Sequence, residues 1–176
     1  MRTVVIGSGS WGTALAQVLQ DNHQEVLVYG VAEAEVNDIN ENHKNSKYFG
    51  DVELNPELKA TTDIQCVKGA DIVLLAVPTI AIDPICHQIN DILDKKTIII
   101  NVSKGFHPET NERMSEVIRR CIDEDKLSSV VSLIGPSHAE EVVIRLLTTI
   151  DAISLNNEDA VTVQNLFSNQ YLRIYT

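Results

Sequence analysis

The sequence predicts an α/β protein with a doubly wound, mostly parallel sheet and helices on both of its faces. Short runs of β-branched and aliphatic residues alternate with longer segments of helical spacing, which is the pattern of successive βαβ units. Runs such as Ile72–Val77 and Thr97–Val102 are almost continuously apolar, as expected of strands that are covered on both faces. A glycine-rich segment directly follows the first apolar run. These three observations together define the expected fold class.

The expected elements alternate along the chain. Strands are predicted at Thr3–Ile6, Glu25–Tyr29, Ile72–Val77, Thr97–Val102, Val130–Ile134, Thr148–Ser154 and Leu172–Tyr175. Helices are predicted at Ser10–Gln20, Ala32–Asn42, Ile80–Ile92, Asn111–Cys121, His138–Ile144 and Glu158–Phe167. Thr62–Gln65 has the form of a capping box that starts a short helix, and the polar stretch Asn42–Pro56 is predicted to be a long loop.

One domain over residues 1–176 is the simplest organisation. No Gly/Ser-rich or Pro-rich linker, internal repeat or low-complexity tract divides the 176 residues, and 44% of them are hydrophobic, which suits a packed core. The 14 Lys and Arg residues face 25 Asp and Glu residues, giving a net charge of −11 that repels nucleic acids and anionic membrane surfaces. We therefore expect neither a nucleic-acid nor a membrane partner.

The cysteines and the apolar runs indicate a cytoplasmic protein. No run approaches the ~18 to 20 apolar residues of a membrane span, and the first residues lack the features of a signal peptide. Cys66, Cys86 and Cys121 are far apart and odd in number, which fits a reducing compartment better than a disulfide framework or a zinc site. We expect them to be buried as small apolar side chains.

The segment Gly7–Gly12 has the pattern G-x-G-x-x-G between a predicted strand and a predicted helix, the context in which this motif binds dinucleotides. Gly7 permits the tight turn, Gly9 lets a pyrophosphate approach the backbone, and Gly12 lets the helix pack closely on the strand. Ser10 lies at the helix N-terminus, where free N–H groups and the positive end of the helix dipole attract an anion. An ordinary flexible turn is the alternative, but the flanking strand and helix favour a Rossmann-like cofactor site.

The end of the second strand normally carries an acidic residue that binds the adenine ribose. Here it reads Val28-Tyr29-Gly30-Val31-Ala32-Glu33, with neither an Asp at the tip nor an Arg for a 2′-phosphate. Glu33 and Glu35 are the nearest charges. We expect Glu33 to lie near the ribose and Glu35 to belong to a solvated first helical turn. NAD is therefore favoured over NADP.

Two further segments follow predicted strands and should open onto the same crevice. Asn101–Phe106 follows one strand and contains Lys104, and Gly135–Glu141 follows the next. Lys104 is then the principal cation of the crevice. Each segment also has an ordinary interpretation, as a surface turn and as a helix start respectively. His138 beside Glu140 matches no metal-binding spacing, so no metal site is expected.

Taken together, Gly7–Ala16, Ala76-Val77-Pro78, Ser103-Lys104-Gly105 and Gly135–Glu141 resemble the bacterial NAD(P)-dependent sn-glycerol-3-phosphate dehydrogenases. The resemblance implies reversible hydride transfer between a nicotinamide cofactor and dihydroxyacetone phosphate or sn-glycerol 3-phosphate, a reaction that feeds phospholipid synthesis. It also implies site roles for particular residues. These are cofactor contacts for Ser10, Trp11 and Ala139, substrate contacts for Gly135 and Ser137, and contacts to both for Lys104.

The sequence departs from this family at three places. Val31 and Ala32 stand where the family often has Arg, which puts NADP preference in doubt, and Leu147 stands where the family often has Pro. The family also continues into a helical domain that holds the proton-transferring lysine, whereas this sequence stops at Thr176. We expect an isolated cofactor half without activity of its own. Its uncovered docking face should favour self-association.

Two other functions fit part of the pattern. The chain could belong to another two-domain dehydrogenase, such as the 6-phosphogluconate or hydroxyacyl classes, but Gly135–Glu141 favours the glycerol-phosphate family. It could also be a stand-alone dinucleotide-binding regulatory module. The presence of Lys104 and Ser137 argues against that function, because a sensor needs no cation that faces a substrate.

Overall fold

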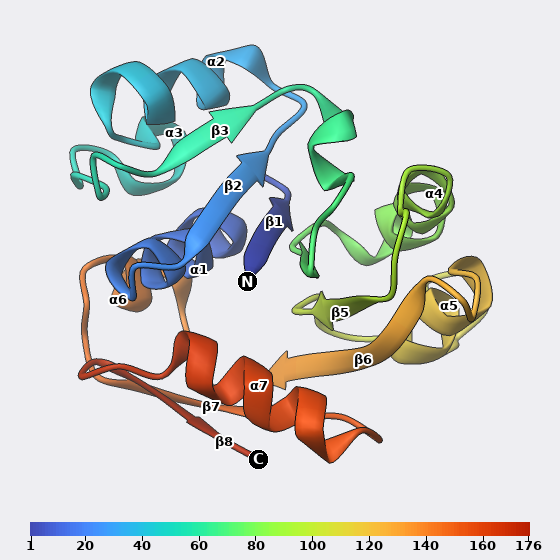
Figure 1. The fold of residues 1–176 in the computed structure, drawn as a ribbon. Helices are drawn as coiled ribbons and strands as arrows, with labels where there is room; N and C mark the ends of the chain where they lie inside the picture. The colour runs from blue at the N-terminus through green and yellow to red at the C-terminus, as the bar shows by residue number, and fades with distance from the viewer.

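A computed structural model of the protein describes all of residues 1–176 and contains one eight-stranded sheet in the order β3-β2-β1-β4-β5-β6-β7-β8 (Figure 1). The strands are β1 (Arg2–Ile6), β2 (Glu25–Tyr29), β3 (Lys59–Thr61), β4 (Ile72–Leu75), β5 (Thr97–Asn101), β6 (Leu127–Ile134), β7 (Thr148–Ile153) and β8 (Leu172–Tyr175). The α-helices are α1 (Ser10–Asp21), α2 (Glu33–Asn37), α3 (Ser46–Phe49), α4 (Thr79–Asn90), α5 (Met114–Cys121), α6 (Ala139–Val143) and α7 (Asn157–Phe167). A π-helical turn, η1 (Asp38–Asn42), and a 3₁₀ turn, η2 (Ile64–Val67), complete the elements.

All neighbouring strands run parallel except β6 and β7, which pair antiparallel with Ser132 opposite Ile153. The doubly wound, mostly parallel sheet that the sequence predicts is therefore confirmed. β1 lies between β2 and β4, so the chain leaves β1 toward one edge of the sheet and later returns to its other side. In sheets of this kind, ligands bind outside the carboxyl ends of the strands at this reversal of strand order.

The sheet separates two hydrophobic cores. One core of 32 buried residues includes side chains from α1, α6 and α7, and the other, of 17 residues, includes side chains from α4 and α5. Figure 1 shows α4 and α5 side by side on one side of the sheet, with α1 and α6 on the other. Within β4, Ile72 and Leu74 belong to the first core and Val73 and Leu75 to the second. This alternation explains why β4 is apolar throughout.

Several local predictions need correction. The expected loop at Asn42–Pro56 contains α3, because Phe49 is buried in the first core. The expected helix at Ala32–Asn42 is an α-helix only to Asn37 and continues as the π-helical turn. The expected helix at Asn111–Cys121 begins at Met114, since Asn111 has a positive φ of 57°. Strand β3 was not predicted, because it is short and only its central residue is buried.

The start of η2 shows the predicted capping with a shift of one residue. Asp63, rather than Thr62, is the capping residue, and its Oδ1 atom accepts a hydrogen bond of 2.9 Å from the Gln65 backbone N–H. A carboxylate satisfies this free donor as well as a hydroxyl does. The short helix therefore begins where the capping pattern predicts, but the capping side chain is that of Asp63, the residue after Thr62.

Asp21 ties the end of α1 to distant parts of the chain. Its carboxylate accepts hydrogen bonds from Arg145 Nε at 2.8 Å, Tyr171 Oη at 2.7 Å and Asn55 Nδ2 at 3.0 Å. Burial raises the pKa of Asp21, but these bonds outweigh burial and leave the pKa below its ordinary value. A lowered folded-state pKa means that this stabilisation is present above the ordinary pKa and is lost as the pH falls through the lowered value.

We expect the Asp21→Ala variant to unfold with a free energy about 2 to 3 kcal/mol lower than the wild type near neutral pH, because the buried Tyr171, the half-buried Asn55 and the exposed Arg145 all lose a charged acceptor. Urea unfolding measures this difference. Asp51→Ala is the matched control, since Asp51 is fully exposed and pairs only with Lys44 at 3.1 Å. A change for Asp51→Ala as large as that for Asp21→Ala would contradict the account.

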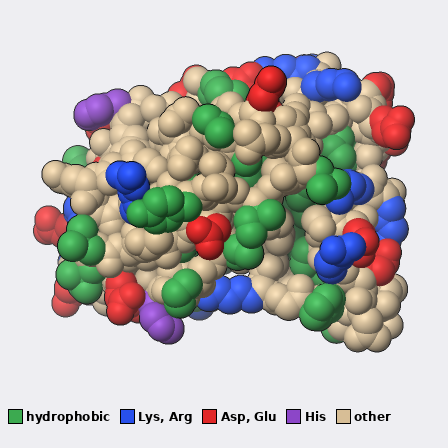
Figure 2. All heavy atoms as spheres, turned by 90° about the horizontal axis from the view of Figure 1, so that it is seen from below, with side chains coloured by type: hydrophobic (Ala, Val, Ile, Leu, Met, Phe, Trp, Pro, Cys, Tyr) green, Lys and Arg blue, Asp and Glu red, His purple; other side chains and the backbone are tan.

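Charged and hydrophobic side chains are intermixed on the face of the molecule drawn in Figure 2. Among the hydrophobic residues of the surface, Leu147 and Leu155 are 86% and 89% exposed, and Ile134 and Ile153 are about half exposed. No helix in the structure combines the length and hydrophobicity that a membrane crossing requires.

Candidate functional site

The glycine loop between β1 and α1 has two glycines that the fold itself requires. Gly7 has a φ of +115°, and a Cβ atom there would collide with the carbonyl oxygen of Ala76. A Cβ atom at Gly12 would collide with the carbonyl oxygen of Gly7 and lie 3.2 Å from the Ala76 side chain. Helix α1 therefore packs against the ends of β1 and β4 at the distance that only glycine permits.

Gly9 differs from these two glycines. A Cβ atom at Gly9 would meet no protein atom within 4 Å, so the space above this residue is open. Gly9 caps α1 and its carbonyl accepts the Thr13 N–H at 3.0 Å, which leaves the N–H groups of Ser10, Trp11 and Gly12 without helical partners. These donors and the dipole of a helix of 12 residues suit a pyrophosphate in the open space.

A first cavity, of about 440 Å³, lies beside the glycine loop at the carboxyl end of β2. Its walls include Gly7, Ser8 and Gly9 on one side and Ala76–Pro78 on another. Its two charged lining residues are Glu35 from α2 and Lys47 from α3. The cavity is thus mainly apolar, with one acidic and one basic group at its edge.

The placement of Glu35 contradicts the prediction of a solvated helical turn. Glu35 is only 9% exposed, and its carboxylate accepts bonds from Ser8 Oγ at 2.5 Å and Lys47 Nζ at 2.7 Å. Burial raises the pKa of Glu35, but the bonds from Lys47 and Ser8 outweigh it and lower the pKa below its ordinary value. Glu33, the residue expected near the ribose, is exposed and does not line this cavity.

The protein makes room for this contact. A Cβ atom at Gly30 would collide with Ser8 Oγ, so the glycine after β2 lets the Ser8 side chain pass toward Glu35. Asn45, fully buried, donates from Nδ2 to the Ser8 carbonyl at 2.7 Å and to Thr13 Oγ1 at 2.9 Å. The polar stretch before α3 therefore holds the glycine loop in place, which its composition did not indicate.

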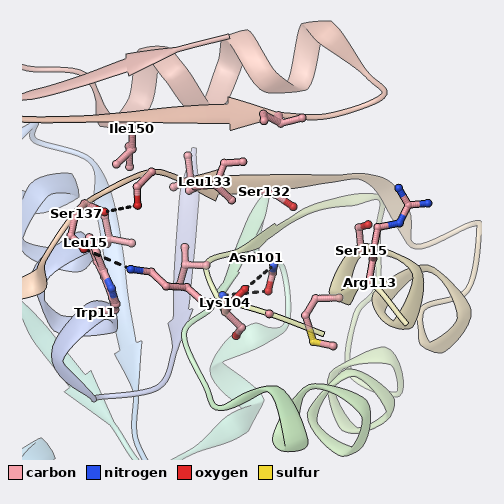
Figure 3. A pocket seen from close by; sticks show the side chains of 17 residues that line it. Trp11, Leu15, Asn101, Lys104, Arg113, Ser115, Ser132, Leu133, Ser137 and Ile150 are labelled. Carbon is pink, nitrogen blue, oxygen red and sulfur yellow. Dashed lines mark hydrogen bonds between the residues drawn. The ribbon is translucent and has the colours of Figure 1, made fainter. Parts of the chain in front are cut away.

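A second cavity, of about 450 Å³, lies at the carboxyl ends of β5 and β6 (Figure 3). Trp11 lies at one end of it, and Arg113 and Ser115 from the start of α5 lie at the other. Lys104 and Ser137 are close to the Trp11 end. The two sequence segments that were expected to share a crevice therefore do so.

Lys104 is exposed and reaches across this cavity. Its Nζ atom donates to the Ser137 carbonyl at 3.4 Å and lies 5.7 Å from the centre of the Trp11 ring. The loop that carries Lys104 is anchored by Ser103, whose Oγ atom donates to the Val77 carbonyl at 2.6 Å. An exposed ammonium group on an anchored loop, beside a half-buried indole, is well placed to bind an anionic ligand.

The Gly135–Glu141 segment packs against β7 and also lines part of the second cavity. A Cβ atom at Gly135 would lie 2.9 Å from the Ile150 side chain, so this glycine allows the chain to pass close to β7. Ser137 is buried and lines the second cavity. Its Oγ atom donates a hydrogen bond of 3.4 Å to the Gly135 carbonyl. Ala139 is 3% exposed and, like Ser10 and Gly12, is not among the residues that line either cavity.

Arg113 is the cavity-lining cation that sequence reasoning missed. It directly precedes α5, pairs with Glu116 at 2.8 Å and has a largely exposed side chain. Nothing in its sequence surroundings distinguishes it from other surface arginines. Only the packing of α5 beside the ends of β5 and β6 brings it to the cavity.

A cluster of possible metal ligands lies elsewhere, between α4 and α5. One ligand atom each of Asp83, His87 and Cys121 falls within 4.8 Å of the others. However, Arg120 already bonds Asp83 at 2.7 Å and donates to the Cys121 sulfur at 3.4 Å, and burial raises the pKa of the Cys121 thiol. A guanidinium beside a protonated thiol is unfavourable for a cation, so we interpret the cluster as an ion-pair network between the helices.

The sheet order, the glycine loop and the two cavities at the strand ends define a Rossmann-like nucleotide-binding domain. The family of the NAD-dependent glycerol-3-phosphate dehydrogenase N-terminus matches residues 2–161, and the chain belongs to this family. The family that the sequence motifs predicted is thereby confirmed, and the 6-phosphogluconate and hydroxyacyl alternatives are not supported.

Individual relatives agree with this assignment. The chain is 47% identical over 176 residues to a glycerol-3-phosphate dehydrogenase [NAD(P)+] of Listeria innocua, and 45% identical over 177 residues to one of Macrococcus caseolyticus. These matches cover 99% and 100% of this chain but 52% and 53% of the relatives. The chain therefore spans about half the length of the curated relatives it matches.

Solved structures show the same fold. A glycerol-3-phosphate dehydrogenase of Coxiella burnetii superimposes with a TM-score of 0.90 at 26% identity, over 99% of this chain and 53% of that chain. The enzyme of Plasmodium falciparum also gives a TM-score of 0.90, at 23% identity, over 99% of this chain and 52% of that chain. Nearly the whole of this chain thus has the fold of about half of each solved chain.

Proposed function

We propose that this domain binds NAD(H), in preference to NADP(H), as the cofactor-binding half of an oxidoreductase. The reaction interconverts sn-glycerol 3-phosphate and dihydroxyacetone phosphate. The observation that carries the proposal is the open space at Gly9, a residue that lines the first cavity and directly precedes the free N–H groups of α1. The names of the Listeria and Macrococcus relatives support the choice of substrate.

The two cavities suit the two ends of a dinucleotide. The pyrophosphate would lie over Gly9 and accept hydrogen bonds from the first turn of α1. The adenosine end would occupy the first cavity, and the nicotinamide end would extend past Trp11 toward Lys104. When bound, the nicotinamide donates or accepts a hydride.

The protein's own residues would orient the phosphorylated substrate. Lys104 offers a positive charge to the anionic substrate without leaving its anchored loop, and the Ser137 hydroxyl offers a hydrogen bond beside it. The assignment of Ser10, Trp11, Gly135 and Ala139 as ligand contacts rests on the family resemblance. For Ser10 the contact uses the backbone N–H, and for the buried Ala139 it is limited to a small exposed surface.

The direct experiment is a calorimetric titration of the 176-residue chain with NADH. The chain has one tryptophan, so its fluorescence provides a second readout that is specific to this site. We expect NADH to quench the Trp11 emission, because reduced nicotinamide absorbs at the wavelengths that tryptophan emits. AMP, which lacks the nicotinamide, is the matched control. Equal quenching by NADH and AMP would contradict the placement of the nicotinamide near Trp11.

A further inference from the structure

The charges of the first cavity consist of one pair. Glu35 and Lys47 are the only acidic and basic residues among its 15 lining residues, which otherwise are apolar or small, apart from Ser8 and two tyrosines. Any discrimination by charge between ligands in this cavity must therefore come from these two side chains. The pair is not recognisable from the sequence, because its members are 12 residues apart on separate short helices.

The two members of the pair are held differently. Glu35 has a 10% exposed side chain and is fixed from both sides, by Ser8 on one carboxylate oxygen and by Lys47 on the other. Lys47 has a 64% exposed side chain and its ammonium group also lies 5.2 Å from the centre of the Tyr48 ring. The carboxylate is thus a fixed charge, and the ammonium is a charge on a flexible stem.

We propose that the Glu35–Lys47 pair determines whether the cavity accepts a ribose with a free 2′-hydroxyl or one with a 2′-phosphate. This inference rests on the proposed function and assigns its cofactor specificity to two residues. A hydroxyl can donate to the carboxylate without disturbing the pair. A phosphate would be repelled by Glu35 and could be bound by Lys47 only at the cost of leaving a buried carboxylate without its cation.

The proposal predicts opposite effects for the two substitutions. Glu35→Gln keeps the size of the side chain and a hydrogen bond with Ser8 but removes the negative charge, so Lys47 becomes free for a phosphate. We expect the affinity for NADPH relative to NADH to rise by about tenfold. Lys47→Gln removes the only cation of the cavity. When it is added to Glu35→Gln, the affinity for NADPH relative to NADH should fall by about tenfold from the value of the Glu35→Gln variant.

The experiment is a set of calorimetric titrations of each variant with NADH and with NADPH, after a thermal melt has shown that the variant is folded. Glu53→Gln and Lys44→Gln are the matched controls, because both residues are near the pair in sequence but line neither the first cavity nor the neighbouring one that Glu35 and Lys47 also border. We expect the ratio of the two dissociation constants to be unchanged in both controls.

The outcomes separate this inference from the function on which it rests. If the wild-type chain binds neither cofactor, the proposed function is overturned and the inference falls with it. If the chain binds NADH but the ratio is unchanged in Glu35→Gln, or shifts equally in the controls, the inference alone is overturned. Lys47 is exposed, so Lys47→Gln should fold even if the buried Glu35 position tolerates no change. In that variant Glu35 is the only charge of the cavity, so the affinity for NADPH relative to NADH should fall, and an unchanged ratio also overturns the inference.

Discussion

Replacing Gly9 by valine should lower the affinity of the chain for NADH by about 100-fold or more while leaving its thermal stability nearly unchanged. The backbone at Gly9 is extended, with φ −72° and ψ −174°, so valine can adopt it, and its Cβ atom would touch no protein atom within 4 Å. The branched side chain would instead fill the space over the N-terminus of α1. Loss of two charge-assisted hydrogen bonds to a pyrophosphate accounts for the expected size of the effect.

A comparison with Gly12→Ala separates binding from folding. The Cβ atom at position 12 would collide with the Gly7 carbonyl, so Gly12→Ala should lower the melting temperature clearly, whereas Gly9→Val should not. Calorimetric titration and a thermal melt of each variant provide the two readouts. Equal NADH affinity in the wild type and Gly9→Val would contradict the pyrophosphate site.

The second large effect concerns catalysis. A protein of these 176 residues should oxidise NADH with dihydroxyacetone phosphate at least about 100-fold more slowly than the full-length relative of Listeria innocua. Reduction of a ketone needs a positioned proton donor. Lys104 is the only lysine among the residues of the second cavity, and its side chain is exposed to water. The family resemblance assigns proton transfer to a lysine outside these residues.

Positioning adds to this deficit. Holding a substrate against a reactant contributes on the order of 7 kcal/mol. Ile134 and Ile153, which line the second cavity, are about half exposed to solvent, so this part of the wall does not enclose a substrate. The assay follows NADH absorbance for both proteins, and Trp11 quenching first shows that NADH is bound to the short chain. Turnover by the short chain within tenfold of the full-length relative would show that the division of catalytic roles is wrong.

The fold was largely predictable because its signals are local. The strand, glycine loop and helix from β1 to α1 follow one another directly, and each apolar run of the buried strands is long enough to be recognised. β3 was not recognisable, since Ala60 is its only buried residue. The antiparallel direction of β7 was not predictable either, because apolar alternation does not specify the direction in which a strand pairs.

The parts of the candidate site that belong to a sequence motif were predictable. The parts that depend on contacts between distant residues were not. Gly7, Gly12 and Lys104 lie where the strand-end argument placed them. Glu35 was misassigned, because helical spacing alone cannot show that Ser8 and Lys47 fold over it and bury it. The same limit explains the choice of Glu33, which is closer to the end of β2 in sequence but faces solvent.

The central claim is that the first turn of α1 binds the pyrophosphate of a dinucleotide, and amide NMR spectra recorded during a titration with NADH test it most directly. We predict that the largest saturable shifts are those of the backbone amides of Gly9–Gly12, with smaller shifts around Glu35 and Lys47 in the first cavity. The amides of β8, at the far edge of the sheet, should not move. Saturable binding with the Gly9–Gly12 amides unchanged, or no shifts at all, would contradict the account.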